Sequence, residues 1–144
     1  MAQISKNFTL AEFTNSATAR AQGIRNEPGI DEVCALCALV HHVLQPLRTW
    51  WGREVRIGSG YRCQRLNKAV GGVSTSQHMR GEAADICIDG SLAKGRQWFQ
   101  WIKANCDFDQ LIWEHNKKGT YWIHVSYRSD GKNRRRVIES LLKT

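Results

Sequence analysis

The sequence lacks long apolar runs. No stretch of its 144 residues reaches the roughly 18 consecutive apolar residues that a membrane-spanning helix needs. The first residues, MAQISKNFTLAEF, lack the apolar stretch that is typical of a signal peptide. We therefore expect a soluble product, synthesised in the cytoplasm without a signal peptide and without a membrane span. A role outside the cell would require another means of release.

The sequence also lacks the cysteine pattern of a disulfide framework. Its five cysteines are odd in number and scattered, which fits a reducing compartment. Cys34 and Cys37, together with His41 or His42, are candidates for a metal site. The two cysteines and His41 lie, however, on the apolar side that helical spacing predicts for residues 30–44. Small buried thiols are therefore the preferred interpretation of these cysteines.

Linkers, internal repeats and low-complexity segments are absent as well. An apolar content of 42% with six tryptophans is enough for a hydrophobic core. We therefore predict that residues 1–144 form a single domain.

Helical patterns come first along the chain, and strand patterns follow. The predicted helices are a short one through Leu10 and Phe13 capped by Asn7 or Thr9, residues 16–22, a long helix from Pro28 to Gly52 with a kink or break at Pro46, and residues 91–105. The predicted strands are residues 55–59, 83–88, 110–114 and 121–127, with an edge strand at 134–138, and residues 62–70 form a short helix or loop. This order predicts an α+β domain, with N-terminal helices packed on a small antiparallel sheet.

Positive charge is in excess. The formal net charge is +8, and the densest group of basic residues lies near the C-terminus, at Arg128, Lys132 and residues 134–136. Such a surface suits anionic polymers, either nucleic acid or the polymers of a bacterial envelope. Charge alone does not separate the two, but no recognised nucleic-acid-binding motif accompanies it, so we expect no specific nucleic-acid partner.

Strand alternation brings two candidate metal ligands to one face of the predicted sheet. In the strand around Asp85, the two isoleucines take the apolar face, so Asp85 points to the opposite one. In the strand around His124, the apolar side chains alternate with His124 in the same way. If the two strands are neighbours, Asp85 and His124 converge, and His78 joins them from the Gly- and Ser-rich loop before Asp85. Two imidazoles and one carboxylate are the ligands of an open zinc site, which keeps a fourth position for water.

Two separated motifs resemble those of a known enzyme family. The residues of the first motif are Ser59, Gly60, Tyr61, Arg62, Asn67, Gly71, Gly72, Ser76, Gln77, His78, Gly81, Ala83 and Asp85. The second motif is Trp122-Ile123-His124, an aromatic residue shortly before a His on a strand. Together with NFTLAEF and residues 43–48, the two motifs resemble those of the zinc D-Ala-D-Ala carboxypeptidase family, which includes phage endolysins that cut the stem peptides of peptidoglycan.

The resemblance implies a hedgehog/DD-peptidase-like fold and a zinc-dependent metallopeptidase. One zinc ion per chain would be held by His78, Asp85 and His124. Arg62 would stabilise the developing oxyanion or bind a substrate carboxylate. The alternative for Arg62 is a structural ion pair with one of the acidic residues.

The resemblance does not directly identify the general base. Many relatives place a Glu three residues before the last zinc ligand, but this sequence has Tyr121 there. Glu114 is the best substitute, provided that the hairpin register sets it opposite Trp122 and so on the face of His124. His115 is the second choice, and Glu82 is interpreted as solvent-facing or structural.

Several functions remain open at this point. The leading hypothesis is a monomeric peptidase acting on peptidoglycan stem peptides, either a D,D-carboxypeptidase or an endolysin-type endopeptidase. It would act on the cell wall after holin-mediated release from a phage-infected cell, and its basic surface would bind anionic envelope polymers. The alternative is a catalytically inactive, metal-containing wall-binding module of the same fold.

Overall fold

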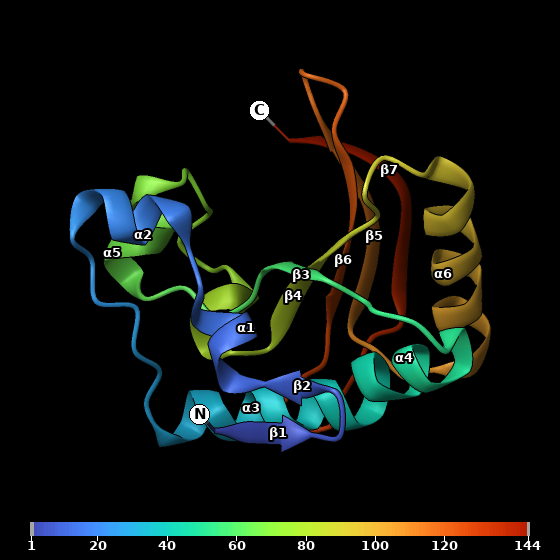
Figure 1. Cartoon of the computed structure of the whole chain (residues 1–144), viewed down its shortest axis with the longest axis horizontal. Coiled ribbons are helices and arrows are strands. Elements are labelled where there is room, and N and C mark those ends of the chain that lie inside the picture. Colours follow the sequence, from blue (N-terminus) through green and yellow to red (C-terminus); the bar gives the residue numbers. More distant parts are fainter. Residues whose placement is uncertain (1, 144) are drawn as a thin grey trace.

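The computed structural model describes residues 2–143, and at its centre is a five-stranded sheet with strand order β3-β4-β6-β5-β7. Helix α6 covers one face of the sheet, α3 and α4 lie along one end of it, and α2 and α5 stand on the side away from α6 (Figure 1). The architecture confirms the predicted α+β fold. The elements are β1 (Gln3–Ser5), β2 (Phe8–Thr9), α1 (Leu10–Thr14), α2 (Ala17–Gln22), α3 (Ile30–Leu39), the π-helical η1 (Val40–Leu44), α4 (Gln45–Trp51), β3 (Ile57–Ser59), α5 (Gln64–Ala69), the 3₁₀-helical η2 (Gln77–Arg80), β4 (Ala83–Cys87), α6 (Leu92–Asn105), β5 (Gln110–Asn116), β6 (Tyr121–Ser126) and β7 (Arg136–Lys143).

The two short N-terminal helices begin and end where their capping residues predict. The Glu12 carboxylate accepts a hydrogen bond from the backbone N–H of Thr9, the residue before α1, at 2.7 Å. The Ser16 hydroxyl caps α2 by accepting from the N–H of Ala19. Gly23 ends α2 with a φ of 64°, a left-handed conformation that glycine adopts without steric cost.

The long helical segment from Ile30 to Trp51 passes Pro46 without breaking. Proline has no N–H to donate, and its ring clashes with the carbonyl four residues earlier in a regular α-helix. The π-helical turn η1, which ends at Leu44 two residues before Pro46, widens the helix in the turn that Pro46 follows. Of the predicted kink or break, the break does not occur, and the helix has a π-helical turn before Pro46 instead. The helix ends at Gly52, as predicted, with a φ of 77°.

The same segment buries a stripe that agrees only in part with the one that its spacing predicts. Leu36, Leu39 and Val43 are fully buried, whereas Cys34 is exposed and Cys37 is half-buried. The interpretation of Cys34 and Cys37 as buried thiols is therefore wrong. Val40 and Leu44 of the predicted stripe are fully buried. The other core contacts are made by Leu36, Leu39 and Val43, two positions beyond Cys34, Cys37 and His41.

By length and composition alone, residues 30–51 are also apolar enough to cross a membrane, with a mean hydropathy of 1.2. The core explains this apolar character, because the leucines and valines of the segment pack against the sheet and α6. The segment thus has the composition that a core helix requires.

The two faces of the sheet differ, as strand alternation predicts. Ile86, Ile123 and Val125 are fully buried and pack in one core with residues of α6 such as Trp98 and Phe99. The opposite face carries polar side chains and faces a cleft. The α6 side of the sheet thus supplies stability, and the other side is available for chemistry.

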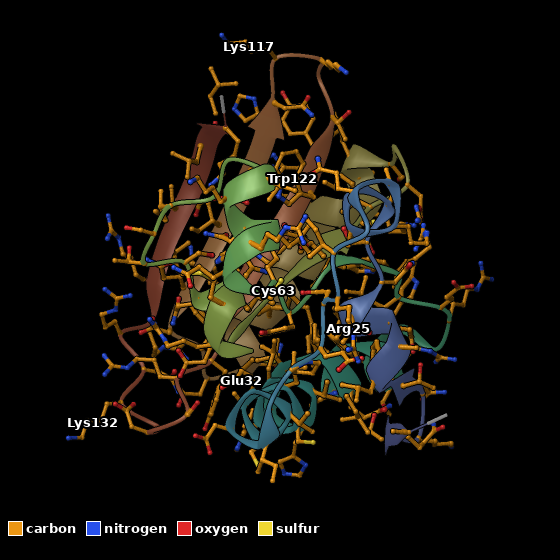
Figure 2. The ribbon with its side chains drawn as sticks, turned by 90° about the vertical axis from the view of Figure 1, so that its left-hand side faces the viewer. Arg25, Glu32, Cys63, Lys117, Trp122 and Lys132 are labelled. Carbon is orange, nitrogen blue, oxygen red and sulfur yellow. The ribbon has the colours of Figure 1, made fainter. Side chains whose placement is uncertain are left out.

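The last strand departs from the predicted antiparallel sheet. β7 occupies the edge, as expected, but it pairs with β5 in parallel. The chain leaves β6 at Ser126, crosses the start of β5 and reverses direction before it reaches the edge. Arg134 holds this crossing loop through hydrogen bonds to the buried Asp109 at 2.8 and 2.9 Å. Figure 2 shows Lys132 at the outer end of this loop, far from Lys117 at the tip of the β5–β6 hairpin.

Candidate metal centre

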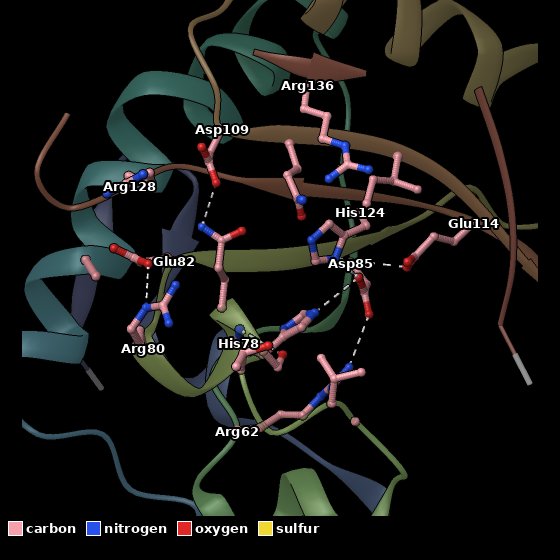
Figure 3. A pocket seen from close by; sticks show the side chains of 18 of the residues that line it. Arg62, His78, Arg80, Glu82, Asp85, Asp109, Glu114, His124, Arg128 and Arg136 are labelled. Carbon is pink, nitrogen blue, oxygen red and sulfur yellow. Dashed lines mark hydrogen bonds and ion pairs between the residues drawn. The ribbon is translucent and has the colours of Figure 1, made fainter. Parts of the chain in front are cut away.

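Three side chains from separate elements converge on the polar face of the sheet. Asp85 on β4 lies directly opposite His124 on β6, and His78 reaches the same point from η2 (Figure 3). The Asp85 Oδ1 atom is 3.1 Å from His124 Nδ1 and 3.4 Å from His78 Nε2. One ligand atom from each residue lies within 4.8 Å of the other two. This cluster is the one that the sequence predicts.

The ring of His78 is oriented by the backbone of the preceding motif. Its Nδ1 is 2.7 Å from the carbonyl oxygen of Gly60, and because a carbonyl can only accept, Nδ1 carries the proton. Nε2 is then the unprotonated nitrogen and points at Asp85. A side chain on Gly60 would collide with the backbone of Phe13, since a Cβ would lie 2.6 Å from its carbonyl oxygen, so only glycine fits there.

Electrostatics hold this cluster in a metal-binding protonation state. Burial lowers the pKa of His78, against the opposing charge of Asp85. Burial also opposes ionisation of Asp85, but the neighbouring imidazoles of His78 and His124 outweigh it, so the pKa of Asp85 lies well below its usual range. A neutral imidazole beside an ionised carboxylate is what a metal site requires.

The donor set fits a zinc ion. Histidine nitrogen and aspartate oxygen are zinc ligands, and three protein ligands leave one position open for catalysis. The hydrogen bond from His78 to Gly60 is also the kind of outer contact that fixes the tautomer of a ligating histidine. His78, Asp85 and His124 are therefore able to hold the ion.

Arg62 stands beside the cluster. Its Nη2 atom is 3.6 Å from Asp85 Oδ2, while Nε and Nη1 donate to the side chains of Ser59 and Asn67 at 3.2 Å each. The guanidinium is thus held in place with an ion pair to a candidate ligand. It also lines the cleft, so a structural ion pair and a role in catalysis are compatible.

Glu114 meets the geometric condition for a base. It pairs with Trp122 across the β5–β6 hairpin, its side chain is 4% exposed, and Oε1 lies 4.0 Å from His124 Nδ1. The indole N–H of Trp122 donates to Oε1 at 2.8 Å, and Lys143 Nζ lies 3.6 Å from Oε2. The carboxylate is therefore fixed at the rim of the cluster.

The other two carboxylate and histidine candidates lie elsewhere. His115 follows Glu114 on β5, so it points to the opposite face, where its ring stacks on Tyr121 at 5.0 Å. Glu82 is buried and accepts from Arg80 and from the backbone and side chain of Ser129. The structural interpretation of Glu82 agrees with these contacts, and His115 is out of reach of the cluster.

A cleft of about 1400 Å³ runs across this face of the sheet. Trp122 lines it, as expected of an aromatic residue beside His124. The cleft also includes residues that the sequence analysis did not single out, notably Asp109 and Lys143. The sequence does not predict Lys143 as a cleft residue because the edge strand is expected to end at residue 138. In the structure, β7 continues to residue 143.

The model of the peptidase M15 family matches residues 6–126, which include the three candidate ligands, Arg62 and Glu114. The chain belongs to the peptidase M15 family. The match confirms the resemblance to zinc D-Ala-D-Ala carboxypeptidases. Membership in this family indicates a metallopeptidase and supports peptidoglycan as the general substrate. A comparison with curated proteins finds no match.

Proposed function

We propose that this M15 peptidase is zinc-dependent and hydrolyses peptide bonds in the stem peptides of peptidoglycan. His78, Asp85 and His124 are the ligands in this proposal. The observation that carries it is their convergence, with ligand atoms within 4.8 Å of one another on the floor of an open cleft. The residues come from a 3₁₀ turn and two paired strands, so a metal ion would join elements that are distant in sequence.

A zinc ion in such a site supplies a Lewis acid and lowers the pKa of a water ligand to about 7. Glu114 takes the proton in this proposal, because its carboxylate is held at the rim of the cluster by Trp122 and Lys143. A general base must lie within hydrogen-bond reach of the proton that it removes. The 4.0 Å between Glu114 and His124 supports this role.

Arg62 provides positive charge on the other side of the cluster. Its hydrogen bonds to Ser59 and Asn67 fix the guanidinium, so no reorganisation is needed when negative charge develops on the substrate. The same group is able to bind a carboxylate of the substrate. Both uses agree with its position in the cleft.

The length of the cleft favours an endopeptidase over a carboxypeptidase. Its lining extends to Leu141 and Lys143 on β7 in one direction and to Asp31 and Arg128 in the other. A peptide can therefore extend on both sides of the cluster, whereas a carboxypeptidase needs to recognise a chain end next to the cut bond. We propose the endolysin-type activity. The alternative, a D,D-carboxypeptidase, would be recognised from its reaction products.

The site of action follows from the substrate. Peptidoglycan lies outside the cytoplasmic membrane, and we propose that the protein reaches it through a holin in a phage-infected cell. The net charge of +8 supports binding to anionic envelope polymers. Release of the protein into the medium of infected cells only when the holin is expressed is the expected result.

Mass spectrometry of the products from defined peptidoglycan tests the reaction. The zinc-loaded protein is expected to release stem-peptide fragments, and the masses identify the bond that is cut. Release of single terminal D-Ala residues would identify a carboxypeptidase instead. Failure to cut any peptidoglycan type, with about one zinc bound per chain, would support the inactive binding module.

A matched pair of variants tests the residues. Glu114→Gln is expected to keep one zinc per chain and to lower kcat by about 100-fold to 10,000-fold. The control is Glu139→Gln, which makes the same change at an exposed residue paired with Lys103 outside the cleft, and it should behave as the wild type. His78→Ala is expected to abolish zinc binding, and full metal content in that variant would exclude the proposed centre.

A further inference from the structure

The C-terminal part of the chain adds a wall to the cleft that the family match does not cover. The match ends at residue 126, whereas β7 extends from Arg136 to Lys143. Arg136, Ile138 and Lys143 of this strand line the cleft. The loop that leads to β7 is firmly attached, since the N–H and hydroxyl of Ser129 both donate to the buried Glu82 carboxylate, at 2.7 and 2.8 Å.

Most of the positive charge in the cleft is already neutralised. Apart from Arg136, each Arg or Lys that lines the cleft lies within 4 Å of a carboxylate. The pairs are Arg62–Asp85, Arg80–Glu82, Arg128–Asp130, Arg134–Asp109 and Lys143–Glu114. Among residues 2–143, Arg136 has no ion pair, and its guanidinium makes no hydrogen bond, although its backbone N–H donates to Asp109. Arg136 is thus the cleft cation that is available to a ligand.

The register of the sheet places Arg136 beside the reaction centre. Arg136 pairs with Gln110 on β5, and His124 pairs with Ile112 on the same strand. Two strand spacings and two residues along the strand separate their Cα atoms, about 12 Å. The Arg136 side chain extends from β7 toward the His124 side of the cleft (Figure 3). An extended peptide advances about 3.3–3.6 Å per residue, so the guanidinium lies one to three residues from a bond held at the cluster.

We propose that Arg136 determines substrate specificity by binding a carboxylate of the stem peptide one to three residues from the cut bond. This inference rests on the proposed function of the same cleft. An exposed guanidinium forms two parallel hydrogen bonds with a carboxylate, and no acidic side chain within residues 2–143 competes for it. A long anionic polymer would need a row of free cations, but the neighbouring basic residues of the cleft are paired, so a single carboxylate is the better match.

Synthetic stem-type peptides test this inference. Each carries a free carboxylate within three residues of the cut bond, and its partner carries the carboxamide at the same place. The wild type is expected to cleave one carboxylate peptide with a kcat/KM about tenfold above that of its carboxamide partner, the factor that 1.4 kcal/mol produces. Arg136→Gln should lose this preference by slowing only the carboxylate peptide, and Arg136→Lys should recover part of it.

Arg53→Gln is the matched control. It removes the same charge at an exposed residue that does not line the cleft, and it should keep the wild-type preference. Equal cleavage of both peptides by the wild type, or an equal loss on both in Arg136→Gln, would overturn the inference. The inference would also be overturned if Arg136→Gln lost binding to isolated wall polymers but kept the peptide preference. Arg136 would then serve polymer attachment.

A binding measurement separates this inference from the proposed function. If the wild type cleaves no peptide, the proposed function fails, and calorimetric titration of the same uncleaved peptides still decides the role of Arg136. Tighter binding of a carboxylate peptide than of its carboxamide, by about tenfold in the wild type and absent in Arg136→Gln, would support it. Equal dissociation constants for both peptides would refute it.

Discussion

Asp109→Asn is expected to destabilise the fold more than any other single charge removal near the cleft. The Asp109 side chain is fully buried and accepts four hydrogen bonds, from the backbone N–H, Nε and Nη2 of Arg134 and from Nε2 of Gln77. These contacts attach the loop before β7 to the residue that precedes His78. Asp109 therefore connects the edge of the sheet to the candidate metal centre.

The size of the effect follows from these contacts. An asparagine keeps one acceptor oxygen, so about two hydrogen bonds to a charged group are lost, at roughly 1.5–3 kcal/mol each. The guanidinium of Arg134 is half exposed and can turn to water, which limits the penalty that an unpaired buried charge would add. We expect a loss of about 3 kcal/mol in the free energy of unfolding. For a domain of this size, that lowers the melting temperature by about 6–12 °C.

The effect also has a defined pH dependence. Hydrogen bonds from Arg134 hold the pKa of Asp109 below its usual range. The native state therefore releases this proton more readily than the unfolded state, whose carboxyl has a pKa of about 3.9. The stabilisation from Asp109 is complete above that value and is lost as the pH falls through the lower pKa of the folded state. The difference between wild type and Asp109→Asn should accordingly shrink below about pH 4.

Urea denaturation at pH 7 and at a series of acidic pH values measures these effects. Asp107→Asn is the control, because it makes the same change in the same loop at a half-exposed carboxylate, 3.7 Å from Arg135. Exposed pairs contribute about 0–1 kcal/mol. The reasoning would be refuted if both variants lost the same free energy of unfolding. It would also be refuted if the destabilisation by Asp109→Asn, relative to the wild type, were unchanged at the lowest pH.

Two further substitutions test packing and the position of the base. Trp122→Phe keeps an aromatic ring in the cleft but removes the hydrogen bond to Glu114. We expect kcat to fall about tenfold with KM little changed. An unchanged kcat would show that Trp122 does not position Glu114. Gly95→Ala would bring a Cβ to 2.8 Å from Trp113 and 2.9 Å from Ile88. Overpacking should exceed the helix-propensity gain and lower the free energy of unfolding by about 1–2 kcal/mol, whereas a more stable variant in urea denaturation would contradict the tight contact.

Local signals predicted most of the elements because capping and turn residues act over a few positions. Ser16 and Gly23 mark the ends of α2, and Ser91 caps α6. Pro46 was a less certain signal, since a proline can break a helix or be accommodated by a wider turn. The buried stripe of α3 was misjudged at Cys34, because a helix whose apolar residues surround much of its circumference does not reveal which side meets the core.

Long-range pairing was beyond these local signals. The parallel pairing of β7 with β5 depends on how the loop after Ser126 crosses the sheet. That crossing is held by Asp109 and Arg134, residues 25 positions apart. No periodicity within β7 encodes which strand will be its neighbour or in which direction it will run.

By itself, the sequence determined that Asp85 and His124 point away from the core, because side-chain direction alternates with the backbone of any strand. The M15 motifs in it, the His78 segment and the Trp122-Ile123-His124 strand, determined the family and its chemistry. Only the tertiary structure decided that β4 and β6 are neighbours, that Glu114 stands opposite Trp122 and that Arg136 lines the cleft with no acidic partner among the described residues 2–143. These facts depend on contacts between residues far apart in the chain, which form only when the whole sheet assembles.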